Sequence, residues 1–222
     1  MKPWETLDSA QVPDVGEVIL ARRSDEYVLR VRGQILMSSR QHGSEEALAE
    51  AGCAHLSGKG GGRVLVGGLG FGYTVRAALN RLGPEGHVTV AELLPAVVVW
   101  NRGPLAPLAR APLEDPRVTV VEGDVGALMA RHSGVFDAIL LDVDNGPVAL
   151  THPDNHALYG LGGLARAARA LRPQGRLVVW SAGPAPGFEK RLGMAGFTTQ
   201  VLNPAAHGSK GTRHTLFVGR RA

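Results

Sequence analysis

The sequence predicts an α/β fold: a doubly wound, mostly parallel, seven-stranded Rossmann-like sheet preceded by a β-hairpin. Three observations predict it. An apolar run at Val64–Val66 enters a glycine-rich turn and then a segment of helical spacing, as at the end of a buried parallel strand. Apolar runs and helical segments then alternate along most of the remaining chain. Residues 15–38 alternate in hydropathy, as a hairpin does.

The first part of the chain supplies the hairpin and one helix. The two hairpin strands are expected at Gly16–Arg23 and Tyr27–Met37, with the turn at Ser24–Glu26. Ser44, followed by two glutamates, predicts the start of a helix, because it combines a capping residue with an acidic first turn. We therefore expect residues 1–57 to form an N-terminal unit and residues 58–222 to form the main domain.

The main domain is expected to alternate strands and helices. Strands are predicted at 63–67, 88–92, 117–121, 136–142, 176–181, 197–202 and 214–219, and helices at 73–82, 95–101, 125–131, 157–171 and 186–195. The last two strands have no helix between them, which predicts an antiparallel hairpin at one edge. Ligands in such sheets bind beyond the carboxyl ends of the strands, so those ends are where functional residues are sought.

Composition narrows the class of protein. The 222 residues can bury one good core, and the formal net charge is +4. The arginines are scattered among acidic residues, so nucleic-acid binding is not expected. No uncharged apolar run of membrane length and no signal pattern appear, so we expect a cytoplasmic protein without a membrane span. The single cysteine, Cys53, excludes an intramolecular disulfide and fits a packed small residue.

The glycine-rich turn predicts a ligand site. Gly68, Gly70 and Gly72 stand at every second position, and such a turn lets a ligand lie against bare backbone at a helix N-terminus. Glu92 ends the next predicted strand, 20 residues after Gly72. That spacing lets an acidic side chain reach a pair of ribose hydroxyls, so the two features together predict a nucleoside cofactor site. The alternative for Glu92 is a surface charge at a strand end.

The carboxyl ends of four successive strands carry distinctive features: the glycine turn, Glu92, Asp124 and Asp142. This arrangement resembles the class I S-adenosylmethionine-dependent transferases and, within them, the spermidine-synthase-like group. The resemblance covers most of the chain, including the hairpin, the 115–124 segment, the Asp-rich turn after the fourth strand and the Leu158–Tyr159 pair. It implies that residues 58–222 form an S-adenosylmethionine-binding catalytic domain.

The resemblance also implies a set of cofactor contacts. The three glycines would face the methionine part and the ribose, and Glu92 would accept hydrogen bonds from both ribose hydroxyls. Leu93 would pack on the adenine, and Asp124 would accept from its amino group with the Val125 backbone nearby. Asp124 is also the expected N-cap of the following helix, a role compatible with adenine binding.

Asp142 and Asn145 are the candidates for catalysis. Spermidine synthases have Asp-Ser-Ser-Asp-Pro at this point, and the first Asp helps to deprotonate the attacking amine. Here Asp142 keeps that first carboxylate, whereas Asn145 stands where the second Asp falls. A carboxylate beside a sulfonium can stabilise the cation and orient the nucleophile, so Asp142 would also contact the cofactor. Asp144 fits a turn residue better than a catalytic one.

The acceptor side departs from the polyamine enzymes. Their glycine-turn Asp falls at Phe71, their hairpin Gln falls near Leu36, and their Tyr-His-Glu motif has become Ser44–Ala47. A polyamine needs an acidic groove, and an aromatic ring has replaced one of its carboxylates. We therefore expect methyl transfer from S-adenosylmethionine to a small nucleophilic acceptor. Aminopropyl transfer from decarboxylated S-adenosylmethionine is the alternative, and a non-catalytic cofactor-binding module is the third.

The acceptor itself would meet residues at the strand ends and in the loop after the fourth strand. The expected contacts are Phe71, His152, Asn155, Tyr159 and Trp180. Core packing explains Trp180 equally well. His152 and His156 have a spacing that metal ligands adopt on helices, but Pro153 disfavours a helix there, so no metal is expected.

The hairpin predicts an oligomer. A two-stranded ribbon is marginal by itself, and this one carries apolar residues at Ile19, Leu20, Ile35 and Leu36. We therefore expect a homodimer built on the hairpin.

Overall fold

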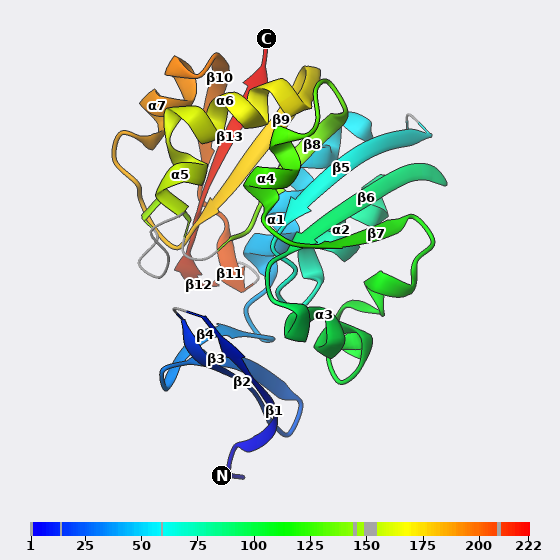
Figure 1. The fold of residues 1–222 in the computed structure, drawn as a ribbon, viewed down its shortest axis with the longest axis vertical. Coiled ribbons are helices and arrows are strands. Elements are labelled where there is room, and N and C mark those ends of the chain that lie inside the picture. The colour runs from blue at the N-terminus through cyan, green and yellow to red at the C-terminus, as the bar shows by residue number, and fades with distance from the viewer. Residues whose placement is uncertain (1, 14, 59, 144–145, 149–154, 208–209) are drawn as a thin grey trace.

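The main domain is a seven-stranded sheet in the order β10-β13-β9-β8-β5-β6-β7 (Figure 1). The structure is a computed structural model, in which residues 2–13, 15–58, 60–143, 146–148, 155–207 and 210–222 are described. Parallel pairing links β7, β6, β5, β8 and β9, and β13 runs antiparallel to both β9 and β10. The predicted doubly wound sheet and its antiparallel edge are therefore confirmed. The strands are β5 (Gly61–Gly67), β6 (Glu85–Glu92), β7 (Val118–Glu122), β8 (Phe136–Leu141), β9 (Leu171–Ser181), β10 (Phe197–Leu202) and β13 (Thr215–Arg221).

Helices cover both faces of this sheet, because the central strands are apolar on both sides. Val64 and Val66 of β5 belong to one apolar cluster, and Leu65 between them belongs to the other. The first cluster includes side chains of α1 (Gly43–Cys53), α2 (Tyr73–Arg81) and α3 (Pro95–Arg102). The second includes side chains of α4 (Val125–Ala130), α5 (Asn155–Tyr159), α6 (Leu161–Ala170) and α7 (Phe188–Met194). Short 3-10 turns occur at Ala54–Leu56, Ala106–Ala109, Pro112–Glu114 and Gly146–Val148.

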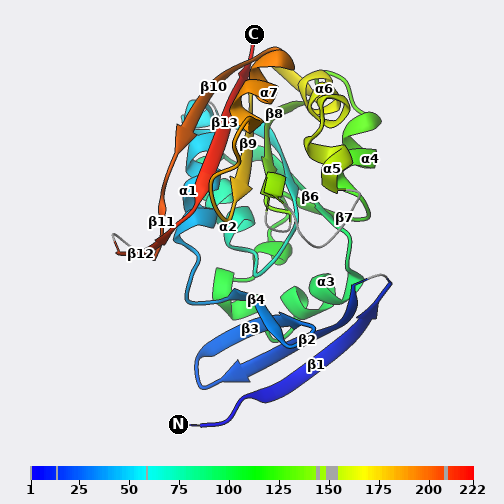
Figure 2. The same cartoon turned by 90° about the vertical axis from the view of Figure 1, so that its left-hand side faces the viewer.

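The N-terminal unit is a four-stranded antiparallel sheet rather than a lone hairpin (Figure 2). Its strands are β1 (Glu5–Val12), β2 (Gly16–Arg23), β3 (Glu26–Val31) and β4 (Gln34–Ser38). The predicted hairpin is β2–β3, with Ser24 in the left-handed region at φ 59°. The predicted strand Tyr27–Met37 breaks into two, because Arg32 and Gly33 form a turn with φ of 50° and 78°. The sequence prediction missed β1 entirely.

Two other segments differ from the predictions. The single helix expected at 157–171 is two helices, α5 and α6, because Gly160 between them has extended backbone at φ −76° and ψ 170°. A small ribbon, β11 (Ala205–His207) and β12 (Lys210–Arg213), precedes β13 and was not expected. No helix among the described residues is long and apolar enough to cross a membrane.

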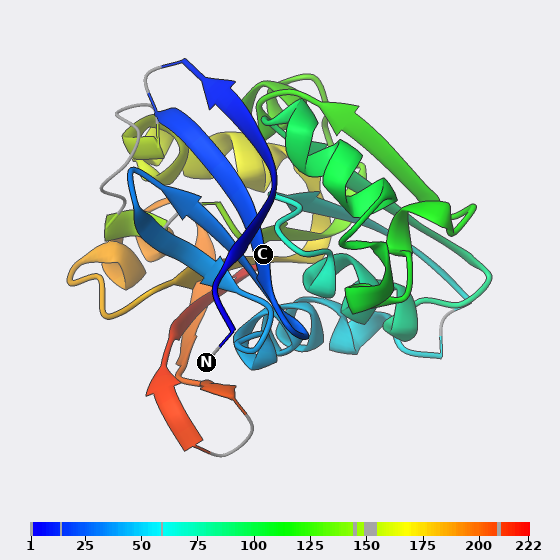
Figure 3. The same ribbon diagram turned by 90° about the horizontal axis from the view of Figure 1, so that it is seen from below.

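The N-terminal sheet docks on the glycine-turn end of the main domain (Figure 3). The indole Nε1 of Trp100, on α3, donates to Asp8 Oδ2 of β1 at 2.6 Å. A Cβ atom at Gly70 would lie 2.9 Å from Met37 Cε, so β4 reaches the turn that follows β5. The N-terminal sheet therefore lies next to the carboxyl end of β5.

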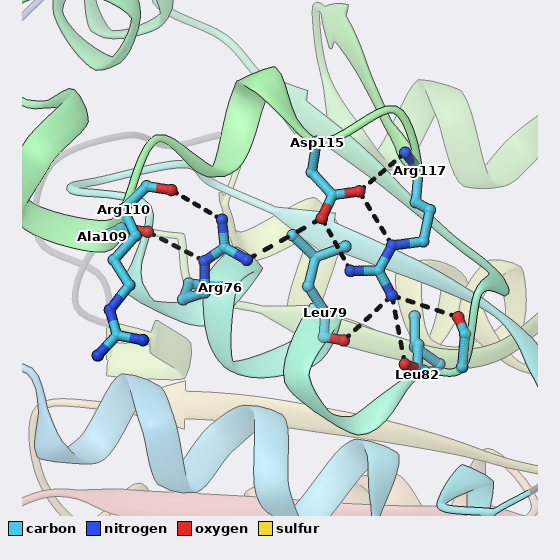
Figure 4. Close-up of polar contacts among 8 residues, drawn as sticks. Arg76, Leu79, Leu82, Ala109, Arg110, Asp115 and Arg117 are labelled. Carbon is cyan, nitrogen blue, oxygen red and sulfur yellow. Dashed lines mark hydrogen bonds and ion pairs between the residues drawn. The ribbon is translucent and has the colours of Figure 1, made fainter.

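An arginine cluster fixes α2 behind the turn (Figure 4). The Arg117 guanidinium donates to the Leu79, Leu82 and Gly83 carbonyls at 3.2–3.4 Å, so it satisfies carbonyls at the C-terminal end of α2. Asp115 accepts two bonds from the same guanidinium, at 2.8 and 2.9 Å. Arg76 lies nearby and donates to two carbonyls of the 106–110 segment at 2.8–3.1 Å.

Candidate active site

The glycine turn lies close against its neighbours. Gly68, Gly70 and Gly72 have φ of 87°, 52° and 83°, a region that favours glycine. A side chain at Gly68 would also collide with the carbonyl oxygen of Asp142, so the end of β8 lies directly against the turn. Asn101 Nδ2 donates to the Gly70 carbonyl at 2.8 Å and fixes the loop from the α3 side. The turn is thus a rigid cradle of bare backbone.

Glu92 is oriented by the backbone. Its Oε2 accepts from Leu69 N and its Oε1 accepts from Leu94 N, both at 2.8 Å, and the side chain is buried. Such a carboxylate is not the mobile surface charge that the sequence left open. Carboxylate oxygens can each accept a second hydrogen bond, so this geometry suits a ribose diol. Leu93 beside it is 59% exposed, as a side chain that packs on a bound ring would be.

Asp124 caps α4, as predicted. Its Oδ1 accepts from Ala127 N at 2.6 Å, and its side chain is exposed at the end of β7. Val125, the first residue of α4, is buried. The cap uses one carboxylate oxygen, so adenine recognition by the other is compatible with it.

Asp142 lies at the centre of the site. Its backbone N–H donates to the Gly67 carbonyl at 2.9 Å, and Thr74 Oγ1 donates to its Oδ2 at 3.1 Å. Burial raises the pKa of the Asp142 carboxyl to about 6, although the Thr74 hydrogen bond opposes the rise. Asp142 is therefore a half-buried carboxylate, directly after β8, whose pKa lies not far below neutral pH.

Glu45 is the residue that the sequence analysis missed. It stands in the first turn of α1 and is only 8% exposed. Burial and then the negative charge of Asp142 raise the pKa of Glu45 well above its usual range, so the two carboxylates act on each other. The acidic first turn was visible in the sequence, but it was explained as a helix start. Only the packing of α1 across the sheet edge brings Glu45 to Asp142.

A second group of side chains lies beside this pair. Leu141 of β8 is level with Val179 of β9, so Asp142, directly after β8, lies beside Trp180 of β9. The Trp180 ring meets His214 edge-on at 4.6 Å, and His214 Nδ1 lies 2.8 Å from Ser44 Oγ. Burial lowers the pKa of His214, which favours the neutral imidazole.

The other residues predicted to contact the acceptor lie in different environments. Tyr159 is buried, and its hydroxyl donates to the Val143 carbonyl at 3.1 Å, next to Asp142. Phe71 is 1% exposed and belongs to the apolar cluster under α1–α3, so its ring packs in the core, and its contact with the acceptor stays a prediction. Asn145 and His152 lie outside the described residues, and Asn155 begins α5. The described residues contain no group of three or more His, Cys, Asp or Glu side chains placed to hold a metal ion.

Comparison with known proteins identifies the fold. No family model matches the chain. A spermidine synthase from Thermotoga maritima superposes with a TM-score of 0.78 over 98% of this chain and 73% of that one, at 19% identity. A spermidine synthase in complex with the transition-state analogue AdoDATO superposes with a TM-score of 0.80 over 98% and 74%, at 18% identity. This chain has the spermidine synthase fold.

Curated relatives of this spermidine-synthase-like chain are polyamine aminopropyltransferases. The protein from Mycobacterium tuberculosis is 33% identical over 175 residues, which cover 76% of this chain and 31% of the relative. The one from Streptomyces coelicolor is 31% identical over 147 residues, covering 61% and 26%. The chain thus spans less than a third of the length of these relatives. The relatives favour aminopropyl transfer, the alternative of the sequence analysis, over the methyl transfer that we expected.

The site of this spermidine-synthase-like fold also fits a nucleoside sulfonium donor. The cradle at Gly68 has no room for a side chain, and Glu92 presents a carboxylate that two backbone N–H groups hold in place. Asp142 adds a half-buried carboxylate where the turn and β8 meet. Carboxylates near bare backbone suit a ligand that carries hydroxyls at one end and a positive charge at the other.

Proposed function

We propose that the chain is an aminopropyltransferase, which transfers the aminopropyl group of decarboxylated S-adenosylmethionine to a primary amine. The observation that carries the proposal is the half-buried Asp142, whose backbone lies against the glycine turn, whose carboxylate accepts a hydrogen bond from Thr74, and whose charge acts on Glu45. The buried carboxyl of Glu45 and the half-buried carboxylate of Asp142 favour a cationic acceptor, because withdrawing negative charge from water without a counter-charge is costly. The relatives named aminopropyltransferases support the same reaction.

In this proposal the residues at the strand ends hold the donor. Glu92 binds the ribose, Leu93 and Asp124 bind the adenine with the Val125 backbone, and the glycine turn lies along the chain that bears the sulfur. When bound, the donor supplies a carbon made electrophilic by the adjoining sulfonium. The contacts of the donor are made by Gly68, Gly70, Gly72, Glu92, Leu93, Asp124, Val125 and Asp142.

In this proposal Asp142 both binds the acceptor and acts as the general base. Its negative charge holds the acceptor beside the sulfonium, and its carboxylate accepts a proton from the acceptor nitrogen. That nitrogen bonds to the propyl carbon, the carbon–sulfur bond breaks with its electron pair going to sulfur, and the proton leaves through Asp142. With a pKa of about 6, Asp142 is mostly ionised at pH 7.5, so it can act as this base. The rate of transfer should therefore rise as the pH increases through about 6, where Asp142 loses its proton.

The acceptor contacts remain proposals. Tyr159 donates to the carbonyl of Val143, the residue after Asp142, and Trp180 stands on β9, the strand that pairs with β8. We propose that both side chains contact the acceptor. Asn145, His152 and Asn155 belong to the segment that follows β8, and we keep them as predicted contacts. Asn145 would orient the acceptor nitrogen with its amide.

Product analysis tests the reaction. The purified chain is given decarboxylated S-adenosylmethionine or S-adenosylmethionine, each with a panel of primary amines. We expect methylthioadenosine from the first donor only; S-adenosylhomocysteine from the second would establish methyl transfer instead, and neither product would indicate a non-catalytic module. Asp142→Asn should lower turnover by about 10²-fold or more while donor affinity changes by no more than a few-fold. Glu122→Gln, an exposed change at the end of β7, should alter neither.

We also propose that the chain forms a homodimer through its N-terminal sheet. Ile35 and Leu36 on β4 are 55% and 42% exposed, whereas Leu20 is buried within the protein and cannot take part. Light scattering at micromolar concentration should give twice the monomer mass, and Ile35→Lys should halve it. A monomer in the unmodified protein would contradict the proposal.

A further inference from the structure

The Thr74 hydroxyl contacts the Asp142 carboxylate directly. Its Oγ1 donates to Asp142 Oδ2 at 3.1 Å, although the two residues are 68 positions apart in the chain. Thr74 is only 2% exposed, so water hardly competes for this hydroxyl. A hydrogen bond to a charged group is stronger than one between neutral groups, and a low local dielectric strengthens it further. The contact can therefore control both the orientation and the charge of the carboxylate.

Two parallel strands bring the partners together. β5 and β8 are paired with Gly67 level with Leu141, so Asp142 leaves β8 where the glycine turn leaves β5. The Asp142 N–H donates to the Gly67 carbonyl at 2.9 Å, which fixes the backbone of Asp142. α2 begins at Tyr73, directly after the turn, so Thr74 stands in the first turn of that helix. The glycine turn thus carries the hydroxyl to the end of β8.

The position of Thr74 in α2 leaves its hydroxyl available for Asp142. A threonine inside a helix commonly donates to the carbonyl three or four residues earlier. Thr74 is the second residue of α2, so no helical turn precedes it, and the Gly70 carbonyl, four residues earlier, accepts from Asn101 Nδ2 at 2.8 Å. The N-terminal end of a helix also carries a partial positive charge. The first turn of α2 therefore favours a carboxylate in its ionised form.

The groups around Asp142 differ in their effect on its charge. Burial raises the pKa of Asp142 and the Thr74 hydrogen bond lowers it, with a result of about 6. On α1, burial and then the charge of Asp142 raise the pKa of Glu45 well above its usual range, so Asp142 ionises first. Burial raises the pKa of Tyr73 on α2 to about 12 and lowers the pKa of His214 at β13, so both are neutral at pH 7.5. Among these groups only Thr74 favours the charged form of Asp142.

We propose that Thr74 is a positioning residue, whose hydroxyl orients the Asp142 carboxylate and favours the ionised form that accepts the proton of the acceptor amine. This inference rests on the proposed function for the role of Asp142 as the base. The hydrogen bond occupies Oδ2 and leaves Oδ1 for the acceptor nitrogen, so it also decides which oxygen takes the proton. Thr74 itself acts through Asp142.

A titration of Asp142 tests the effect on its charge without turnover. The full chain is isotope-labelled at its aspartate carboxyl carbons, and the NMR signal of Asp142 is identified by its loss in Asp142→Asn. Thr74→Val keeps the shape of the side chain and removes the hydroxyl, so it should raise the pKa of Asp142 by about one pH unit, a tenfold change in acid dissociation. Thr74→Ser restores the hydroxyl and should return the pKa to that of the unmodified chain.

Thr199→Val is the matched control for this titration. The Thr199 hydroxyl also donates to a carboxylate, Glu189 Oε1, at 3.1 Å, but on the surface beside β10. Removing it should leave the pKa of Asp142 unchanged.

The pH dependence of turnover tests the effect on orientation. With decarboxylated S-adenosylmethionine and an amine, Thr74→Val should move the rise of turnover to higher pH by about one pH unit. It should also lower the limiting rate at high pH by about three- to tenfold, because a freely rotating carboxylate is less often aligned with the amine. Thr74→Ser should restore both. Methylthioadenosine affinity, measured by calorimetry, should stay within twofold in each variant.

Each outcome decides one of the two proposals. An unchanged pKa of Asp142 in Thr74→Val would overturn the inference, and so would a Thr74→Ser variant that behaves like Thr74→Val. A raised pKa with an unchanged limiting rate, or a larger loss of methylthioadenosine affinity, would also refute the positioning role. If no amine yields methylthioadenosine while the pKa of Asp142 still depends on the hydroxyl, the proposed function fails and the control of Asp142 by Thr74 stands. Should Thr74→Val fail to fold, Thr74→Ala removes the same hydroxyl.

Discussion

Removing the charge of Asp142 should stabilise the protein near neutral pH. The Asp142 carboxyl has its pKa raised from 3.8 to about 6 by burial, so the folded state holds its proton more tightly than the unfolded chain does. Stability therefore falls as pH rises between those two values. At about 1.36 kcal/mol for each pKa unit, the raised pKa lowers the free energy of unfolding by about 3 kcal/mol at pH 7.5, relative to a carboxyl with the same pKa in both states. At pH 5, where folded Asp142 is still mostly neutral, the loss is about 1.5 kcal/mol.

Asp142→Asn keeps the shape and the oxygen that accepts from Thr74 but cannot ionise. We therefore expect the variant to be more stable than the unmodified protein, with a gain about 1.5 kcal/mol larger at pH 7.5 than at pH 5. Urea unfolding followed by tryptophan fluorescence at the two pH values measures it. Glu122→Gln, the exposed control, should show no difference. A variant that is less stable at pH 7.5, or equally stabilised at both pH values, would refute the reasoning. The same variant should lose turnover, so stability and activity would change in opposite directions.

Two further predictions address the donor site and the acid stability of the fold. Glu92→Gln should weaken methylthioadenosine binding by about 10–100-fold in calorimetry, because an amide has only one oxygen and cannot accept hydrogen bonds at both positions that the carboxylate oxygens occupy. A change within twofold would argue against Glu92 as the ribose ligand. Glu122→Gln is the control. The Arg117 guanidinium holds the pKa of Asp115 down at about 2, so Asp115 should stabilise the fold by about 2 kcal/mol above pH 4, a contribution lost as pH falls from 4 toward 2. Asp115→Asn should therefore lower the free energy of unfolding at pH 7 and change it much less at pH 2.5, and an equal loss at both would contradict this.

The central sheet could be predicted because the burial of each strand is visible in its own sequence. Strands such as β5 and β8 are buried on both faces, so they appear in the sequence as continuous apolar runs that end at glycine or aspartate. The edge strand of the N-terminal sheet, β1, has no such apolar run. Most residues of β1 are polar and exposed, and its pairing with β2 rather than its own hydropathy makes it a strand. The break between β3 and β4 was hidden because Arg32 occupies a left-handed conformation that non-glycine residues seldom adopt.

The donor half of the site was equally accessible from the sequence. In a parallel sheet the carboxyl ends of successive strands meet at one edge, so the order of the strands along the chain was enough to place Glu92, Asp124 and Asp142 together. Thr74 and His214 could not be placed in this way. Their contacts with Asp142 and Ser44 depend on how α2 and β13 pack, which hydropathy does not specify.

The acceptor half shows why a missing motif residue is weak evidence of a missing charge. Phe71 stands where the resemblance places an aspartate, and that substitution argued against a polyamine acceptor. In the folded chain Phe71 belongs to the core, and Glu45 brings a carboxylate to Asp142 from another element. The electrostatics of a site depend on where charges lie in space and how deeply they are buried, not on the position in the chain that supplies them. Hence a cation site can persist while its sequence motif disappears. Buried Glu45 and half-buried Asp142 are therefore a stronger guide to the charge of the substrate than Phe71 is.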